Sequence, residues 1–300
     1  MRGRLIVGVI ALIALFSACA SDDGSDETGA QGSGSEAEQC PEDYQGADIY
    51  PVFISSEITA GEGQRFLVGL LDSNDAPFSS DAVEMRGNFE PVEGGEGGAS
   101  TDFSFIETVP SQDRGVYVGY PSFDAAGTWA VEISVSGDGV DEELRGCFEV
   151  TDKGTTPAIG AKAPASDVPT IADVNDLGEI STDDDPNPRF YQVTPAQALK
   201  KRDPFVLVFA TPKYCTSQVC GPTLDEVEMI VAEYPKLTVI HSEIYKDLEP
   251  TSPVVPAVEE WGLPSEPWVF VVDSDGKVVA KYEGSVSPDE LQPVLDSLDI

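Results

Sequence analysis

The chain has 300 residues and a formal net charge of -37 at pH 7, because 54 acidic residues outnumber 17 lysines and arginines. Such a surface repels nucleic acid and anionic lipid, so we expect no nucleic-acid partner. About 260 residues follow the N-terminal leader and tether described next, enough for two domains with adequate cores.

The first residues resemble the signal peptide of a bacterial lipoprotein. Two arginines precede an apolar run over residues 5–16, and two small residues stand directly before Cys19. The run is too short to span a membrane comfortably, so we predict a signal peptide over residues 1–18. The resemblance implies a lipid on Cys19 and a place on the extracytoplasmic face of the cell membrane. Residues 19–39 contain no large apolar side chain, which predicts a disordered acidic tether.

Residues 40–151 show short alternating segments separated by turn residues, as in an antiparallel β-sandwich. Residues 123–135 resemble a late strand of immunoglobulin-like modules, in which a glycine turn leads to a strand with a core tryptophan. We therefore predict an immunoglobulin-like β-sandwich. The expected strands cover residues 50–55, 65–71, 83–89, 103–108, 115–120, 128–135 and 144–150.

Four cysteines remain once Cys19 is assigned to the lipid, and outside the cytoplasm they are expected to form two pairs. Cys40 precedes the first expected strand and Cys147 lies in the last, so the two can meet in a closed sandwich. Neither stands at a helix start or beside a basic residue, which favours a structural disulfide. The sandwich shows no catalytic constellation and is expected to be a spacer or a partner-binding module.

Residues 152–188 are rich in Pro, Asp, Thr and Ala with little periodicity, which predicts a linker or an extended lead-in to the next domain. Acidic residues gather between positions 173 and 185. The helix-loop-helix calcium pattern needs an oxygen ligand where Leu177 stands, so we predict no metal site.

Residues 189–300 alternate between strand and helix signals, and two capping boxes, Thr194 to Gln197 and Ser287 to Glu290, open helices. The order strand, helix, strand, helix, hairpin, helix is typical of an α/β thioredoxin-like domain. The strands are expected over residues 205–210, 237–244, 268–272 and 277–282, with helices near 194–201, 224–234, 257–261 and after 287.

Two segments of this domain also resemble thioredoxin-like proteins in sequence. Residues 206–215 end in Cys215 just after the first buried strand, and residues 263–273 resemble the segment that holds a cis-proline, matched here by Pro267. The resemblance implies a redox-active pair, Cys215 and Cys220, with Pro267 shaping a substrate groove and no tightly bound cofactor. Positions five apart on one helix lie about 140° apart round its axis, so both cysteines are expected in the loop before the helix.

The order of attack is left open by two possible matches. Alignment through the strand makes Cys215 the attacking cysteine and Cys220 the resolving one, whereas alignment of Cys220-Gly-Pro with the thioredoxin Cys-Gly-Pro reverses the roles. The run Cys-Thr-Ser-Gln-Val-Cys-Gly from Cys215 is also similar to Q-type peroxiredoxins, which would imply a thiol peroxidase. Peroxiredoxins need a threonine where Pro212 stands. They also use an activating arginine late in the chain, and no arginine follows Arg202. Both differences count against peroxidase chemistry.

His241 is the only histidine and is expected on the strand behind the cysteines, on the same face as Glu243. It can be a structural residue or a proton shuttle, and Sco-type copper chaperones, which use two cysteines and a histidine, offer a copper-carrier alternative. We predict a membrane-tethered thiol–disulfide oxidoreductase acting on thiols and disulfides of envelope or secreted proteins. The non-enzymatic alternative is a binding protein with two structural disulfides.

Overall fold

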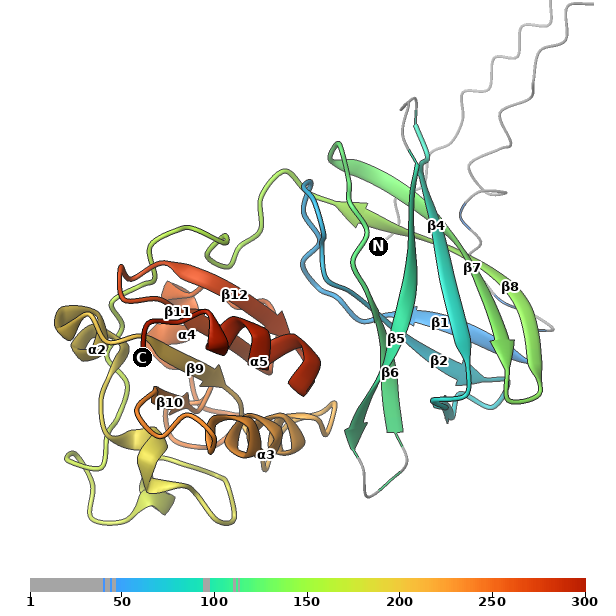
Figure 1. Ribbon diagram of the computed structural model, residues 1–300. Helices are drawn as coiled ribbons and strands as arrows, with labels where there is room; N and C mark the ends of the chain where they lie inside the picture. The colour runs from blue at the N-terminus through green and yellow to red at the C-terminus, as the bar shows by residue number, and fades with distance from the viewer. Residues whose placement is uncertain (1–39, 41–43, 45–46, 94–97, 110–111, 113) are drawn as a thin grey trace, which may run out of the picture. The chain divides into compact units, whose positions relative to one another are not determined.

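The computed structural model describes residues 40, 44, 47–93, 98–109, 112 and 114–300 (Figure 1). The predicted signal peptide, Cys19 with its predicted lipid, and the predicted tether lie outside these residues. No helix within the described ranges is long and apolar enough to cross a membrane.

The first part of the described chain is an antiparallel sheet of eight strands, in the order β1-β2-β6-β5-β4-β7-β8 with the short β3 paired to β2. The strands form because apolar side chains alternate along them: Trp129, Val131, Ile133 and Val135 of β7 are all buried. The strands are β1 (Ile49–Phe53), β2 (Phe66–Asp72), β3 (Pro77–Phe78), β4 (Glu84–Pro91), β5 (Ala99–Val109), β6 (Arg114–Gly119), β7 (Gly127–Gly137) and β8 (Val140–Val150).

The predicted sandwich of two separate sheets is wrong, because one long strand belongs to both halves. The first residues of β5, up to Phe103, pair with β4, and its residues from Ser104 onward pair with β6. The two halves are therefore one continuous sheet, and β1 also lies against β8, so that the sheet is nearly closed into a barrel. Its interior is filled by packed aromatic rings, among them Phe66, Phe89, Phe123, Trp129 and Phe148.

Cys40 and Cys147 form a disulfide, as predicted, with their Cα atoms 5.2 Å apart. The bond joins the segment before β1 to β8 and closes a sequence separation of 107 residues. A loop of that length corresponds to about 4–5 kcal/mol of stabilisation in the chain-entropy description.

The second sheet has four strands in the order β10-β9-β11-β12. Strands β9 (Phe205–Phe209) and β10 (Thr238–Ser242) are parallel, while β11 (Trp268–Val272) runs antiparallel to both β9 and β12 (Val278–Glu283). Every residue of β9 and β11 is buried. Helices must therefore cover both faces of the sheet.

One face of this sheet packs on α3 (Cys220–Val231) and α5 (Pro288–Asp296), and the other on α2 (Pro195–Lys201) and α4 (Pro256–Glu260) (Figure 1). Both predicted capping boxes are confirmed. The Thr194 hydroxyl accepts a hydrogen bond from the N–H of Gln197, and the Glu290 carboxylate accepts one from the N–H of Ser287. The hairpin between β11 and β12 is confirmed as well, with Gly276 at a φ of 73°.

The predicted fold class, a sandwich followed by an α/β thioredoxin-like domain, is corrected by this architecture. Strands dominate the chain, and only four α-helices occur in the described residues, the longest of 12 residues. Between β10 and β11 only Pro256–Glu260 is α-helical, and the rest of that connection is irregular. The chain is therefore mostly β, a nearly closed eight-stranded sheet followed by a smaller mixed sheet, and the thioredoxin-like assignment is not retained.

Residues 152–188, predicted as a linker or lead-in, lie along the second sheet. The N–H of Ala163 donates to the carbonyl of Gly276 at 3.0 Å, and Val168 and Ile180 are buried in its cores. The segment contains the 3₁₀ turn Leu177–Glu179, and the 3₁₀ turn Pro188–Tyr191 follows it. This path brings Thr182 to the end of β10, where it contributes to the site described next.

Candidate functional site at the Cys215–Cys220 disulfide

Cys215 and Cys220 form a disulfide beside the carboxyl end of β9, with their Cα atoms 5.9 Å apart. The chain leaves β9 at Phe209 and turns twice before α3, through hydrogen bonds from Tyr214 N–H to the Thr211 carbonyl and from Gln218 N–H to the Cys215 carbonyl. Cys215 lies in the loop, as predicted. Cys220 does not, because it is the first residue of α3.

The two sulfurs have different surroundings. Cys215 is 9% exposed, whereas Cys220 is completely buried. The Cys215 Sγ accepts a hydrogen bond from the backbone N–H of Cys220 at 3.3 Å and lies 3.2 Å from the Ser217 Oγ. Since no side chain caps the start of α3, its first N–H groups are available to a negative sulfur. These donors and the helix dipole favour a thiolate at Cys215 once the disulfide opens.

A buried carboxyl group, Glu243, stands just beyond β10. Its Oε1 accepts hydrogen bonds from the Thr182 N–H at 2.5 Å and the Thr182 hydroxyl at 2.8 Å. Burial raises the pKa of Glu243, the hydrogen bonds from Thr182 and Thr211 lower it, and the charge of Glu266 raises it. The net result is a pKa of about 7. Glu243 therefore exchanges a proton near neutral pH.

Glu266 is a second buried carboxyl group at the same edge of the sheet. Strand register pairs Trp268 with Phe209, which brings Glu266 and Pro267, joined by a cis peptide bond, alongside the residues that follow β9. Burial raises the pKa of Glu266, and hydrogen bonding by Thr211 opposes that rise. The Oε2 atoms of Glu243 and Glu266 have no hydrogen-bond partner among the described residues. Because burial raises the pKa of both carboxyls and the charge of Glu266 adds to the rise at Glu243, the two groups favour holding at least one proton.

A short hydrogen-bonded path links these carboxyls to the disulfide loop. The Thr182 hydroxyl donates to Glu243 and accepts from the N–H of Lys213, two residues before Cys215. Thr182, Thr211 and Glu266 were missed by the sequence analysis. Only Glu266 had a usable signal, since it directly precedes Pro267.

His241 is buried, and both of its ring nitrogens are engaged. Its Nε2 lies 3.0 Å from the Ala210 carbonyl, which can only accept, so Nε2 donates; Nδ1 then accepts from the Tyr191 hydroxyl at 2.7 Å. Burial lowers the pKa of His241 to about 4, so the ring is neutral at neutral pH. A copper carrier needs a free imidazole nitrogen, which this arrangement does not offer.

The buried state of Glu243 leads to a prediction about stability. Its folded pKa of about 7 lies above the value of 4.5 for an ordinary glutamate, so stability present below pH 4.5 is lost as the pH rises through 7. Glu243→Gln keeps the Oε1 acceptor but carries no proton to lose. We expect the variant to be more stable than the wild type by about 2–3 kcal/mol at pH 8, with the gain absent near pH 4.

Urea unfolding across this pH range measures the effect, with the exposed Glu233→Gln as control. A gain that is independent of pH, or one that the control shares, would contradict the assignment of a raised pKa to Glu243.

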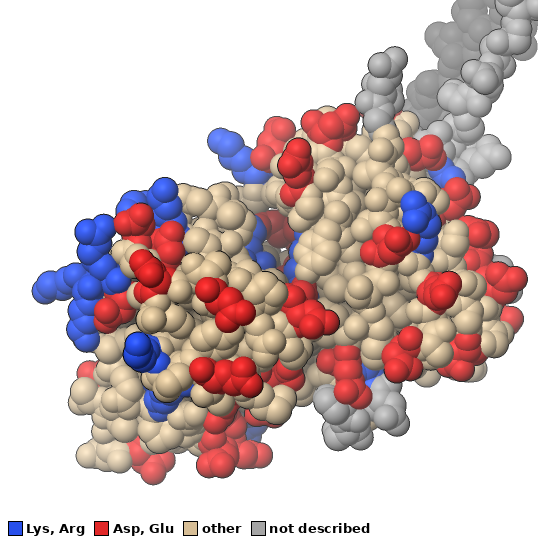
Figure 2. All heavy atoms as spheres, in the orientation of Figure 1, with Lys and Arg blue, Asp and Glu red and all other residues tan. Residues whose placement is uncertain are grey.

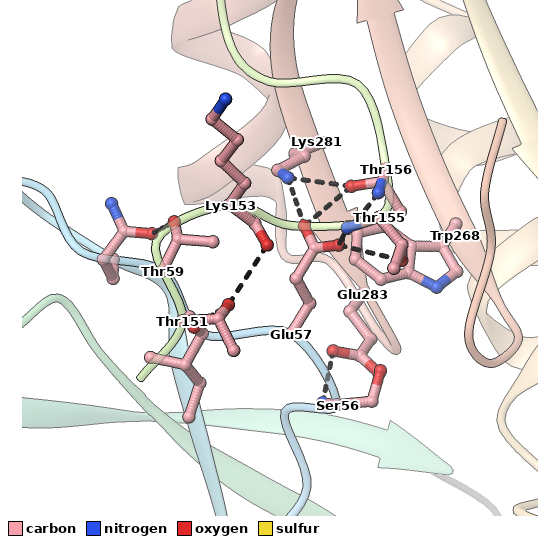
Figure 3. A network of polar contacts seen from close by, with 12 residues as sticks. Ser56, Glu57, Thr59, Thr151, Lys153, Thr155, Thr156, Trp268, Lys281 and Glu283 are labelled. Carbon is pink, nitrogen blue, oxygen red and sulfur yellow. Dashed lines mark hydrogen bonds and ion pairs between the residues drawn. The ribbon is translucent and has the colours of Figure 1, made fainter. Parts of the chain in front are cut away.

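The eight-stranded sheet is joined to the second sheet by a network of polar contacts (Figure 3). The Glu57 carboxylate accepts from the Lys281 ammonium at 2.5 Å and from the backbone N–H groups of Thr155 and Thr156. Burial alone would raise the pKa of Glu57, but the bonds from Lys281 and Thr156 lower it. Glu57 and Lys281 neutralise each other's charge, which favours a structural junction over a ligand site.

No family model matches the chain, and the comparison with curated proteins found no match. Among solved structures, the Escherichia coli adhesin FdeC matches with a TM-score of 0.22 and 12% identity over 38% of this chain. The chain spans 38% of the length of that structure, and a match of this quality carries no argument about fold or function. No family model therefore supports the resemblance to thioredoxin-like proteins and Q-type peroxiredoxins. The mostly β architecture contradicts that resemblance.

Proposed function

We propose that the protein is a thiol–disulfide oxidoreductase that exchanges disulfides with secreted or envelope proteins through Cys215 and Cys220. The observation that carries the proposal is the asymmetry of the disulfide. Cys215 keeps 9% of its surface exposed and its Sγ accepts a hydrogen bond from an N–H at the start of α3, whereas Cys220 is completely buried. Such an arrangement suits one attacking sulfur and one resolving sulfur.

The exchange balances as follows. A substrate thiolate attacks the Cys215 Sγ, the bond between Cys215 and Cys220 breaks, and Cys220 leaves as a thiolate that takes up a proton. A second substrate thiolate then attacks the substrate sulfur of the mixed disulfide and releases Cys215 as a thiolate. The substrate loses two electrons and the cysteine pair gains them. We propose that Glu243, hydrogen-bonded through Thr182 to the start of the disulfide loop, acts as the proton donor and acceptor of the site.

We propose further that the protein works at the extracytoplasmic face of the cell membrane, anchored by a lipid on Cys19. Support comes from the signal-like residues 1–18 and from two disulfides, which persist in oxidising compartments. Incorporation of labelled palmitate into the wild type but not into Cys19→Ala would support the anchor. Equal labelling of both would contradict it.

The reduction potential of the Cys215–Cys220 pair tests the enzymatic proposal, by titration in glutathione buffers. We expect a value between about -270 and -120 mV, the range of exchange catalysts. A value below about -300 mV would identify a structural disulfide and contradict the proposal. The Cys40–Cys147 pair is the internal control, expected to stay oxidised throughout.

A further inference from the structure

A groove of about 370 Å³ lies between β5 of the eight-stranded sheet and α3 of the second. The same helix begins with Cys220, and Thr223, one turn further on, lines the groove. Arg114 of β6 lies 3.5 Å from Gln218 in the disulfide loop. The groove therefore adjoins the first turn of α3, the turn that carries Cys220.

The groove is acidic. Glu107, Asp225 and Glu226 line it, and its described lining residues include no Lys or Arg. Burial raises the pKa of Asp225 and of Glu226, and the charges of Asp183 and Glu228 raise that of Asp225 further. Figure 2 shows that acidic side chains predominate over the region of α3. A positively charged occupant would restore favourable electrostatics.

The groove also holds apolar surface and unpaired hydroxyls. Met229 of α3 is 63% exposed along it, and Val109 lines its opposite wall. The hydroxyl oxygens of Thr223 and Ser285 are buried and have no partner among the described residues, although residues of both kinds are normally hydrogen-bonded when buried. A peptide backbone lying here brings N–H and C=O groups that can pair with them.

We propose that this groove binds an extended, cationic segment of the substrate protein next to its reacting cysteine, so that charge selects the substrate. The inference rests on the proposed function, since it names the substrate class of the same site. A second copy of this chain is a poor occupant, because it would bring the same net charge of -37.

The test uses two labelled peptides of equal length, one rich in Lys and one rich in Glu, each with Ser in place of the reacting cysteine. Fluorescence anisotropy with the folded chain measures binding without any redox step. We expect the Lys peptide to bind and the Glu peptide not to bind. The double variant Asp225→Asn, Glu226→Gln should weaken binding of the Lys peptide about tenfold.

The matched control removes the same charge far from the groove, in the double variant Glu84→Gln, Asp141→Asn on exposed positions of β4 and β8. It should change binding by less than about twofold. Equal weakening by both double variants would mean that only the overall charge attracts the peptide, and would overturn the groove. If the protein exchanges disulfides but binds the Lys and Glu peptides equally, the proposed role of the groove is wrong and the proposed function stands. If it binds only the Lys peptide but exchanges no disulfides, the proposed function is wrong.

Discussion

Replacing Cys220 with serine is expected to trap substrates as mixed disulfides on Cys215, while replacing Cys215 should abolish exchange. The reason is geometric, because Cys215 is 9% exposed and Cys220 is completely buried. In the reverse direction of the exchange, the Cys215 thiolate attacks a substrate disulfide and Cys220 resolves the resulting mixed disulfide, so without Cys220 no internal thiol resolves it. Steady-state exchange should fall by roughly a thousandfold or more in both variants, as when a nucleophile is lost in other enzymes. Non-reducing gels and mass spectrometry would identify the trapped species.

The second disulfide gives the control for this experiment. The double variant Cys40→Ser, Cys147→Ser should keep exchange activity while losing stability, since that bond joins strand β8 to the segment before β1, away from α3. If Cys215→Ser instead trapped substrates on Cys220, Cys220 would be the attacking cysteine and the order of attack would be reversed. Absence of trapping by either variant would count against an exchange mechanism.

Arg65→Met is expected to lower the free energy of unfolding by about 3–5 kcal/mol, the usual cost of leaving one charge of a buried pair alone. The Arg65 guanidinium bonds Glu290 at 2.6 Å, and it also donates to the carbonyls of Glu283 and Ser285. The side chains of Arg65 and Glu290 are 11% and 7% exposed. Methionine fills similar volume but leaves one carboxylate and two carbonyls without their donor.

The pH dependence distinguishes this effect from lost packing. Burial would raise the pKa of Glu290, but the charge of Arg65 and hydrogen bonds from Arg65, Tyr120 and Ser287 hold it below its usual value. In the wild type the stabilisation by the ionised Glu290 is therefore present above pH 4.5, the pKa of an ordinary glutamate in the unfolded chain. It is lost as the pH falls through the lower pKa that Glu290 has in the folded protein. In the variant the charge and hydrogen bonds of Arg65 no longer lower the pKa of Glu290, so the difference between the two proteins should widen as the pH rises from acid to neutral.

Urea unfolding at several pH values measures this difference, with Arg86→Met as the matched control. Arg86 forms an exposed pair with Asp102, at 53% and 77% exposure, so its loss should cost less than about 1 kcal/mol. A similar loss in both variants, or a difference that does not change with pH, would show that the Arg65–Glu290 pair is not the source of the stability.

The elements that the sequence predicted correctly depend on local chemistry. The capping boxes at Thr194 and Ser287 satisfy N–H groups within one turn, and the hairpin at Gly276 needs a left-handed residue at one position. The buried strand β9 was visible as an apolar run. Cys40 and Cys147 could be paired because the expected export signal and the lipid predicted on Cys19 leave few combinations of cysteines.

The fold class and most of the site were decided by tertiary structure. Strand β5 joins the two halves because its chain neighbours β4 and β6 pair with its two ends, and the sheet then grows by longer-range pairings, β2 on β6 and β7 on β4. The raised pKa of Glu243 likewise depends on burial contributed by distant segments, and the acidic groove exists only where β5 meets α3. Alternation and spacing report one segment at a time, whereas sheet closure, burial and charge coupling arise between segments far apart in the chain.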